Sequence, residues 1–260
     1  MAGARRFHAV FTAAADAYDA FMGRYSGPLA PLFCDFAGVD SRQRVLDVGC
    51  GPGALVTELV TRVGAKNVSA VDPAAQFVEA ARERNPGVDV RGASAERLPF
   101  DDLEFDASLA QLVVHFMSDP VGGLSEMRRV TRAGSVVAAC VWDHAGGGGP
   151  LSPFWAAVHA LDSAAEDESR FAGARSGHLT ELFGEAGLRE VHESSLEVGV
   201  RHPSFEAWWQ PFTFGVGPAG AYLKGLDDER QVEVRARCRE MLGPGPFVIE
   251  ARAWAARGLV

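Results

Sequence analysis

Short apolar runs alternate with helical stretches through the first half of the chain, and this alternation is the strongest constraint on the fold. The runs with the length and composition of buried strands are RVLDV (44–48), NVSAVD (67–72), VDVR (88–91), FDASLAQL (105–112) and SVVAACVW (135–142). Helical stretches at 54–63, 73–84 and 121–131 separate several of them. Alternating strands and helices predict a parallel sheet, covered by helices on both faces, with right-handed crossovers.

The pattern changes after Trp142. A glycine-rich loop at 144–150 leads into helical stretches near 152–166 and 176–186, and 190–200 alternates as a strand does. An aromatic segment, a charged helix and a last apolar run complete the chain at 203–226, 227–241 and 247–256. We therefore expect a Rossmann-like, doubly wound and mostly parallel sheet. Its last strand should be antiparallel and preceded by a helical insertion.

The length of 260 residues suits a single domain. The parts expected within it are an N-terminal helical cover (1–40), a glycine-loop core (41–143), a substrate-side or lid region with the insertion (144–246) and a final strand (247–260). In the cover, apolar residues recur at helical spacing, and Gly27 and Pro28 are expected to break the helix.

Charge and composition narrow the possible partners. The net charge of −9, without a run of Lys or Arg, disfavours nucleic-acid binding, and no apolar run reaches the length of a membrane span. Asp16 and Asp19 interrupt the N-terminal apolar stretch too early for a secretory signal. The cysteines have no CxxC spacing and the histidines no metal spacing, so we expect no disulfide framework, no metal site and a cytoplasmic location. A small-molecule partner and a monomer or homodimer are expected.

A glycine loop, Gly49-Cys50-Gly51-Pro52-Gly53, follows the first strand. Glycines let the chain turn sharply and let a ligand approach the backbone. The helix after the loop would present free N–H groups at the edge where open α/β sheets bind ligands. The loop alone fits a structural turn equally well, and with Ala54 it also meets the GxGxxG/A spacing of NAD-binding folds.

Acidic residues near the loop narrow the kinds of cofactor that it could bind. Asp47 lies inside the first strand, and Asp72 ends the second, where a carboxylate can accept hydrogen bonds from ribose hydroxyls. The pair Ala95-Glu96 lies in a loop that could border an adenine ring. The NAD fingerprint calls for neither the acid in the first strand nor the Ala-Glu pair. For Asp72, capping of the next helix is the alternative.

The segments VLDVGCGPG, AVDP, GASAERLPF and FDASLAQLVVHF together resemble the class I S-adenosylmethionine (SAM)-dependent methyltransferases. They are most similar to the small-molecule group that includes the ubiquinone and menaquinone C-methyltransferases. The resemblance covers residues 15–143 and implies SAM as cofactor and S-adenosylhomocysteine as product. The cofactor-binding residues that it implies are Tyr18, Arg24, Asp47, Gly49, Cys50, Gly51, Asp72, Pro73, Ala95, Glu96 and Gln111.

The same resemblance implies a role for each group. Asp47 and the loop glycines would line the methionine part of SAM, Asp72 would hold the ribose, and Ala95-Glu96 would flank the adenine amino group. Gln111, near the end of the fourth strand, would face the cofactor. The segment AYDAFMGRYS (17–26) resembles the family's cofactor cover, with Tyr18 and Arg24 directed at the SAM carboxylate. Ordinary packing and surface roles are the alternative for these two residues.

His115 is the candidate catalytic base, because it follows the fourth strand where substrate would enter and an unperturbed imidazole has a pKa of about 6.5. The alternative is a histidine that packs beneath the cofactor. Candidate substrate-pocket residues are Trp142, His144, Phe154, Trp208 and Trp209. Aromatic residues at helical spacing fit either a lid over a flat substrate or the core.

Two functions remain open. The first is an enzyme that transfers a methyl group from SAM to a small organic acceptor, at oxygen, carbon or nitrogen. The second is a SAM-binding protein without transferase activity, acting as a sensor or partner subunit.

Overall fold

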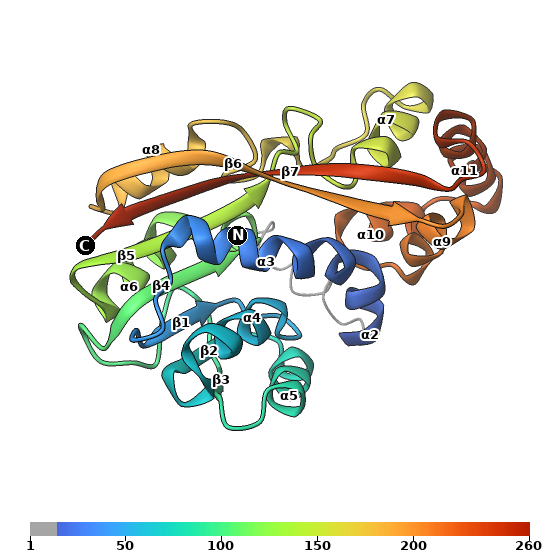
Figure 1. Cartoon of the computed structure of the whole chain (residues 1–260). Helices are drawn as coiled ribbons and strands as arrows, with labels where there is room; N and C mark the ends of the chain where they lie inside the picture. The colour runs from blue at the N-terminus through green and yellow to red at the C-terminus, as the bar shows by residue number, and fades with distance from the viewer. Residues whose placement is uncertain (1–14) are drawn as a thin grey trace.

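A single sheet organises the computed structural model, which describes residues 15–260. Its strands are β1 (Val45–Val48), β2 (Val68–Asp72), β3 (Asp89–Gly92), β4 (Phe105–Gln111), β5 (Thr131–Trp142), β6 (Arg189–His202) and β7 (Phe247–Leu259). They lie in the order β3-β2-β1-β4-β5-β7-β6 (Figure 1). The first five strands pair in parallel, and β7 runs antiparallel to both β5 and β6. The expected mostly parallel sheet with an antiparallel last strand is confirmed.

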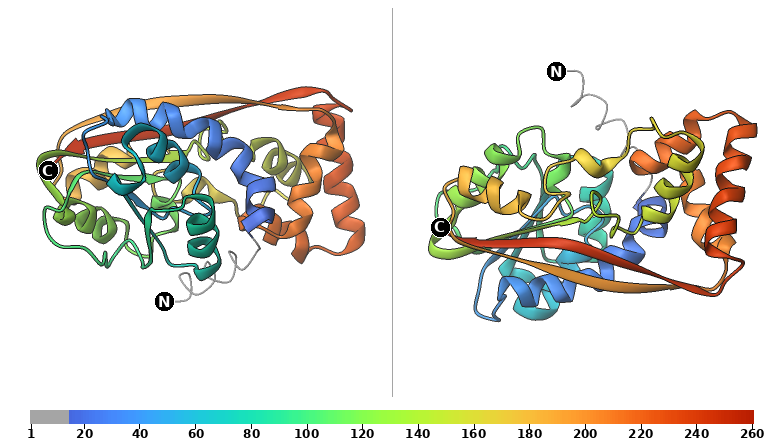
Figure 2. Two further views of the ribbon diagram at one scale, coloured as in Figure 1. Left: turned by 60° about the horizontal axis from the view of Figure 1, so that its bottom comes forward. Right: turned by 90° about the horizontal axis from the view of Figure 1, so that it is seen from above.

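Helices cover both faces of the sheet (Figure 2). The longer ones are α3 (Arg24–Ala37), α4 (Ala54–Val63), α5 (Ala75–Arg84), α6 (Pro120–Val130), α7 (Ser152–Leu161), α8 (His178–Glu185), α10 (Gly217–Gly225) and α11 (Asp228–Leu242). The short ones are α2 (Ala15–Tyr18), η1 (Asp19–Gly23), η2 (Ala65–Asn67), η3 (Val114–Phe116), η4 (Glu168–Arg170), α9 (Phe205–Trp209) and η5 (Gln210–Phe214). Buried side chains of α3, α4 and α5 form one core with the sheet, and those of α6 and α8 form a second core on the opposite face.

The alternation of side chains along β1 determines where the central acid points. Val45 belongs to the core under α3 and α4, whereas Leu46 and Val48 belong to the core under α6 and α8. Since neighbouring residues of a strand face opposite sides, Asp47 shares the face of Val45. A carboxylate therefore projects into the layer between the sheet and the N-terminal helices.

The prediction that Gly27 and Pro28 end the N-terminal helix is wrong. Helix α3 continues through Pro28 and also contains Pro31. A proline inside a helix removes a backbone hydrogen bond and crowds the preceding turn. Here the buried face of α3, which includes Tyr25, Leu29 and Phe33, offsets that cost.

The second half of the chain extends one side of the sheet. Strands β6 and β7 form a long antiparallel ribbon that carries α9, η5, α10 and α11 at one end (Figure 1). This confirms the helical insertion before the last strand. Aromatic rings fill the contact between the insertion and α7, and Phe154 stacks on Phe212 with ring centroids 4.8 Å apart.

Candidate functional site

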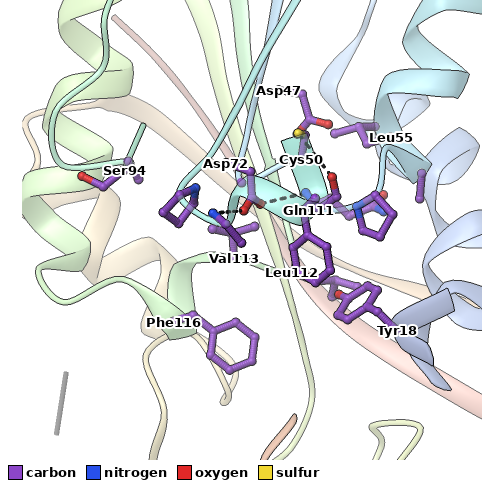
Figure 3. Close-up of a pocket in the computed structure, with 18 of the residues that line it drawn as sticks. Tyr18, Asp47, Cys50, Leu55, Asp72, Ser94, Gln111, Leu112, Val113 and Phe116 are labelled. Atoms are coloured by element: carbon purple, nitrogen blue, oxygen red, sulfur yellow. Dashed lines mark hydrogen bonds between the residues drawn. The ribbon is translucent and has the colours of Figure 1, made fainter. Parts of the chain in front are cut away.

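A cavity of about 580 Å³ opens at the carboxyl ends of β1, β2 and β4. Its walls come from the glycine loop, the segment after β2, the loop after β3, the end of β4 and the N-terminal helices (Figure 3). The residues predicted to bind the cofactor that line it are Tyr18, Asp47, Gly49, Cys50, Gly51, Asp72, Pro73, Ala95, Glu96 and Gln111. A volume of this size is ordinary for a small-molecule site.

Asp47 lies in this wall as a buried acid that lacks a partner. Its side chain is 1% exposed, and neither carboxylate oxygen forms a hydrogen bond within the described chain. Burial, with the nearby charge of Asp72 as a smaller cause, raises the pKa of the Asp47 carboxyl well above its usual range. A cationic group in the cavity would supply the missing partner and favour the ionised carboxylate.

Two glycines of the loop disfavour replacement by a residue with a side chain, for different reasons. Gly49 has φ 76°, and a Cβ there would lie 2.5 Å from the methyl groups of Val113. Gly51 has φ 51°, and a Cβ there would meet no atom within 4 Å. Because Gly51 also lines the cavity, its bare backbone leaves room for a ligand at this point.

Asp72 supports the loop and also lines the cavity. Its Oδ2 accepts a hydrogen bond from Gly51 N–H (2.9 Å) and its Oδ1 accepts one from Ala74 N–H (2.8 Å), as the dashed lines of Figure 3 mark. Burial raises the pKa of Asp72 to about 6, although these two bonds counteract the rise. Each oxygen keeps a second lone pair that could accept a hydrogen bond from a ligand hydroxyl. Ala74, not Asp72, occupies the N-cap position of α5.

The remaining polar residues of the cavity wall form hydrogen bonds with some of their polar atoms. Glu96 Oε1 accepts hydrogen bonds from Ser118 N–H (2.8 Å) and Asp119 N–H (3.3 Å). Its carboxylate thus joins the loop after β3 to the entry of α6. Gln111 donates to the carbonyl of Ser26 in α3 (3.1 Å), while its Oε1 is buried without a partner among the described residues.

Arg24 does not reach the cavity, contrary to the prediction. Its guanidinium donates to the carbonyls of Phe21, Ala207 and Trp208, at 3.1 Å each, and lies 3.4 Å from His202 Nδ1. These contacts join α3 to α9 and the end of β6 and hold the guanidinium there. Sequence spacing could not reveal this, because Ala207, Trp208 and His202 are about 180 residues away.

A smaller recess of about 40 Å³ adjoins the cavity and contains the candidate base. His115, Trp142 and His144 line it, and Tyr18, Leu112 and Phe116 line both spaces. In Figure 3, Tyr18, Leu112 and Phe116 lie on the side of the cavity away from Asp47. The other predicted substrate-pocket residues, Phe154, Trp208 and Trp209, are buried in the core and line neither space.

Several lining residues were not predicted. Leu112 follows β4 with φ 62°, a left-handed conformation that is uncommon for a leucine. Its N–H donates to the carbonyl of Cys140 (2.8 Å), which ties the turn to β5. Glu168, in η4, is 2% exposed and lines the recess. A positive φ and tertiary burial leave no local pattern, so only Phe116, beside His115, could have been suspected from the sequence.

Residues 46–139 match a family model described as a methyltransferase domain. These residues form a methyltransferase domain. The match includes Asp47, the glycine loop, Asp72 and His115, so it covers most of the large cavity. The prediction of this family from the sequence motifs is confirmed.

Similar proteins extend the comparison. The chain is 36% identical over 115 residues to 2-methyl-6-phytyl-1,4-hydroquinone methyltransferase 2 of Oryza sativa, covering 43% of this chain and 31% of that protein. An uncharacterized methyltransferase of Mycobacterium tuberculosis is 35% identical over 133 residues, covering 51% of each chain. The chain thus spans about half, or less, of the curated relatives that it matches. The crystal structure of a putative methyltransferase from Bacillus halodurans shares the fold, with TM-score 0.55 and 17% identity over 88% of this chain and 97% of that one.

The donor set of the methyltransferase domain fits SAM. Buried Asp47 without a partner suits an ammonium group, and Asp72 suits ribose hydroxyls. Within residues 15–260, no cluster of three or more His, Cys, Asp or Glu side chains could hold a metal ion. None of the described helices is long and apolar enough to cross a membrane.

Proposed function

We propose that the chain binds SAM in the large cavity and transfers its methyl group to a small organic acceptor. The observation that carries this proposal is the buried carboxylate of Asp47, which faces the cavity beside the glycine loop without a partner. The ammonium end of SAM would pair with it. The match to the methyltransferase family over 46–139 supports the same assignment.

Other residues would then orient the cofactor. Asp72 would accept hydrogen bonds from the ribose, the backbone at Ala95 and Glu96 would border the adenine, and Gln111 Oε1 would face the methionine part. Tyr18 would cover the site from the N-terminal helix. When bound, SAM supplies a methyl group on a positively charged sulfur. The protein mainly has to align an acceptor behind that methyl group, an effect worth about 7–11 kcal/mol of barrier.

The acceptor would approach from the side of Tyr18, Leu112 and Phe116, where the large cavity meets the recess. We propose that residues 15–40 cover the cofactor, 41–143 bind it, 144–246 complete the acceptor side and 247–260 supply the final strand; residues 1–14 of the expected cover lie outside the described residues. A small, apolar acceptor suits these largely aromatic and aliphatic walls. The rice relative is named for a hydroquinone that carries an apolar phytyl chain. The four cysteines are unpaired and buried, which supports a reducing cytoplasm as the place of action.

Calorimetry and a methylation assay test the proposal. SAM and S-adenosylhomocysteine should each bind the purified chain, and methyl-labelled SAM should transfer label to at least one small acceptor. The absence of binding heat with both ligands would contradict the cofactor site. Binding without transfer to any acceptor would contradict the enzymatic assignment.

A further inference from the structure

The recess beyond the cofactor cavity is large enough for one chemical group but not for a whole acceptor. A cavity needs about 10–15 Å³ to hold one water molecule, so the recess of about 40 Å³ accommodates a few atoms. Most of its wall is apolar and includes the aromatic side chains of Phe21, Phe116 and Trp142. Because Tyr18, Leu112 and Phe116 also line the large cavity, a group in the recess would belong to a molecule lying beside the cofactor.

Glu168 places an acid in this apolar wall. Its side chain is 2% exposed, and its Oε2 has no hydrogen-bond partner among the described residues. Burial raises the pKa of Glu168 to about 7, and the charge of Asp167 adds to the rise while the indole of Trp155 opposes it. A buried carboxyl without a full set of partners is costly, and such groups concentrate at functional sites.

The segment around Glu168 is held on both sides. Asp167 Oδ1 accepts a hydrogen bond from Ser169 N–H (2.9 Å) and caps the short helix η4. On the other side, the ring of Phe171 stacks on His115, with ring centroids 6.3 Å apart. These contacts direct the Glu168 side chain inward without help from its own carboxylate.

Two histidines share the recess and are neutral near pH 7. Burial, with His144 as the second cause, lowers the pKa of His115 well below its usual value. Burial also lowers the pKa of His144 to about 4, although Asp167 and Asp143 oppose the shift. His115 Nδ1 has no partner in the described chain, so a neutral imidazole remains available for a hydrogen bond. The preferred proton acceptor is a group whose pKa lies near the working pH, which favours Glu168 over His115.

We propose that the recess binds the hydroxyl group of a small, otherwise apolar hydroxy compound, and that Glu168 accepts the hydroxyl proton as the oxygen is methylated. The inference rests on the proposed function and specifies its acceptor class. The acceptor oxygen forms a bond to the methyl carbon while the sulfur–methyl bond breaks and leaves its electron pair on sulfur. The hydroxyl proton moves to the Glu168 carboxylate. The negative carboxylate and the positive sulfonium are both neutralised, which a low-dielectric recess favours.

The test compares Glu168→Gln with Glu166→Gln, which makes the same change at an exposed neighbour. Simple phenols serve as acceptors, each paired with its methyl ether, which has no hydroxyl. We expect Glu168→Gln to lower kcat for phenols at saturating SAM by about 10²-fold or more, while S-adenosylhomocysteine affinity stays unchanged. Glu166→Gln should retain wild-type kcat.

The pH profile separates proton transfer from a structural role. The groups around Glu168 are Asp167, which lies 3.7 Å from His159, with His115, His144 and Tyr18 on the other walls. Wild-type kcat should rise with pH, with its midpoint near pH 7 where Glu168 ionises, and reach a plateau above that pH, whereas Glu168→Gln should lose this limb. Infrared difference titration without acceptor should show a buried carboxyl band that titrates near that pH in the wild type and is missing in Glu168→Gln, while the bands of Asp47 and Asp72 remain in both.

The possible outcomes distinguish failure of this inference from failure of the proposed function. A Glu168→Gln protein with unchanged kcat and pH profile would overturn the inference, and so would a rise in KM alone. Transfer to carbon or nitrogen acceptors but to no phenol would overturn the acceptor class. In all these cases SAM would still bind and the proposed function would stand, whereas loss of SAM binding by the wild type would remove both. Unchanged S-adenosylhomocysteine affinity also shows that Glu168→Gln is folded.

Discussion

At the scale of single residues, Asp47 has opposite effects on the empty protein and on the complex. A carboxyl whose pKa is raised on folding binds its proton more tightly in the native state than in the unfolded state. Its contribution to stability is therefore lost as the pH rises from the unfolded value of about 4 through the folded value. Burial of this carboxyl therefore destabilises the ligand-free protein at neutral pH, and a cationic group bound beside it would offset that cost.

We expect Asp47→Asn to raise the melting temperature of the ligand-free protein near pH 7, because the free-energy cost of burying an ionisable carboxyl is removed. The same change should weaken SAM binding by about 10- to 150-fold, the equivalent of the 1.5–3 kcal/mol of a charged hydrogen bond. Thermal melts with and without S-adenosylhomocysteine, together with calorimetry, measure both effects. Asp101→Asn, on an exposed loop, is the control and should change neither. Unaltered SAM affinity in Asp47→Asn would remove Asp47 from the cofactor site.

At the scale of elements, two glycines around α4 allow the backbone cost of a substitution to be measured separately from its effect on ligand binding. Gly51 and Gly64 flank the same helix, both have positive φ (51° and 80°), and a Cβ at either would meet no atom within 4 Å. Only Gly51 lines the cavity. Alanine at either position should cost about 1–2 kcal/mol of stability for the left-handed backbone.

We therefore expect Gly51→Ala and Gly64→Ala to lower the free energy of unfolding by similar amounts, whereas only Gly51→Ala weakens SAM binding. Urea unfolding and calorimetry on the two variants provide the comparison. Equal affinity in both would mean that the ligand does not approach the backbone at Gly51.

Elements with a local signature were predictable, and those fixed by distant contacts were not. Asp47, Gly51 and Asp72 line one cavity because consecutive parallel strands end at one edge, which alternation along the sequence already implies. Glu168 lies in a short helix without periodicity, and the contact between Phe171 and His115, which holds this segment, joins residues far apart in the sequence. Helix α3 passes Pro28 because tertiary burial outweighs local propensity.

The same distinction explains the aromatic residues. Their helical spacing is compatible with a lid or a core, and the structure places Phe154, Trp208 and Trp209 in the core. Which face of a helix is buried depends on the insertion that packs against it, and no pattern in one helix specifies that neighbour. The same limit applied to Arg24.

At the scale of the whole molecule, buried neutral histidines make the fold sensitive to acid. Burial lowers the pKa values of His115, His144 and His202, the last two to about 4. The unfolded chain takes up protons at these positions below about pH 6.5, and the folded chain does not until lower pH. Each of these histidines should therefore lower the stability as the pH decreases from about 6.5 towards 4, opposite in sign to the contributions of Asp47, Asp72 and Glu168.

His202 offers the cleanest test, because it lies outside both cavities and accepts or donates to Tyr25 Oη at 3.0 Å. We expect His202→Gln to lose less stability than the wild type over this pH range, since one such proton uptake is removed. Urea unfolding at several pH values measures the slope. Identical slopes of stability against pH in the two proteins would contradict the lowered pKa of His202.

The division between the two cavities also bears on how such a protein changes over evolution. The wall of the large cavity comes almost entirely from the segment that matches the methyltransferase family, apart from Tyr18, Asp19 and Ser26. Most of the wall of the recess comes from outside that segment, from the N-terminal helices and from the chain after β5. Mutations in the second set can alter the acceptor while the cofactor site is inherited intact. Proteins descended from one ancestor could thus come to act on different acceptors while they keep the same cofactor-binding residues.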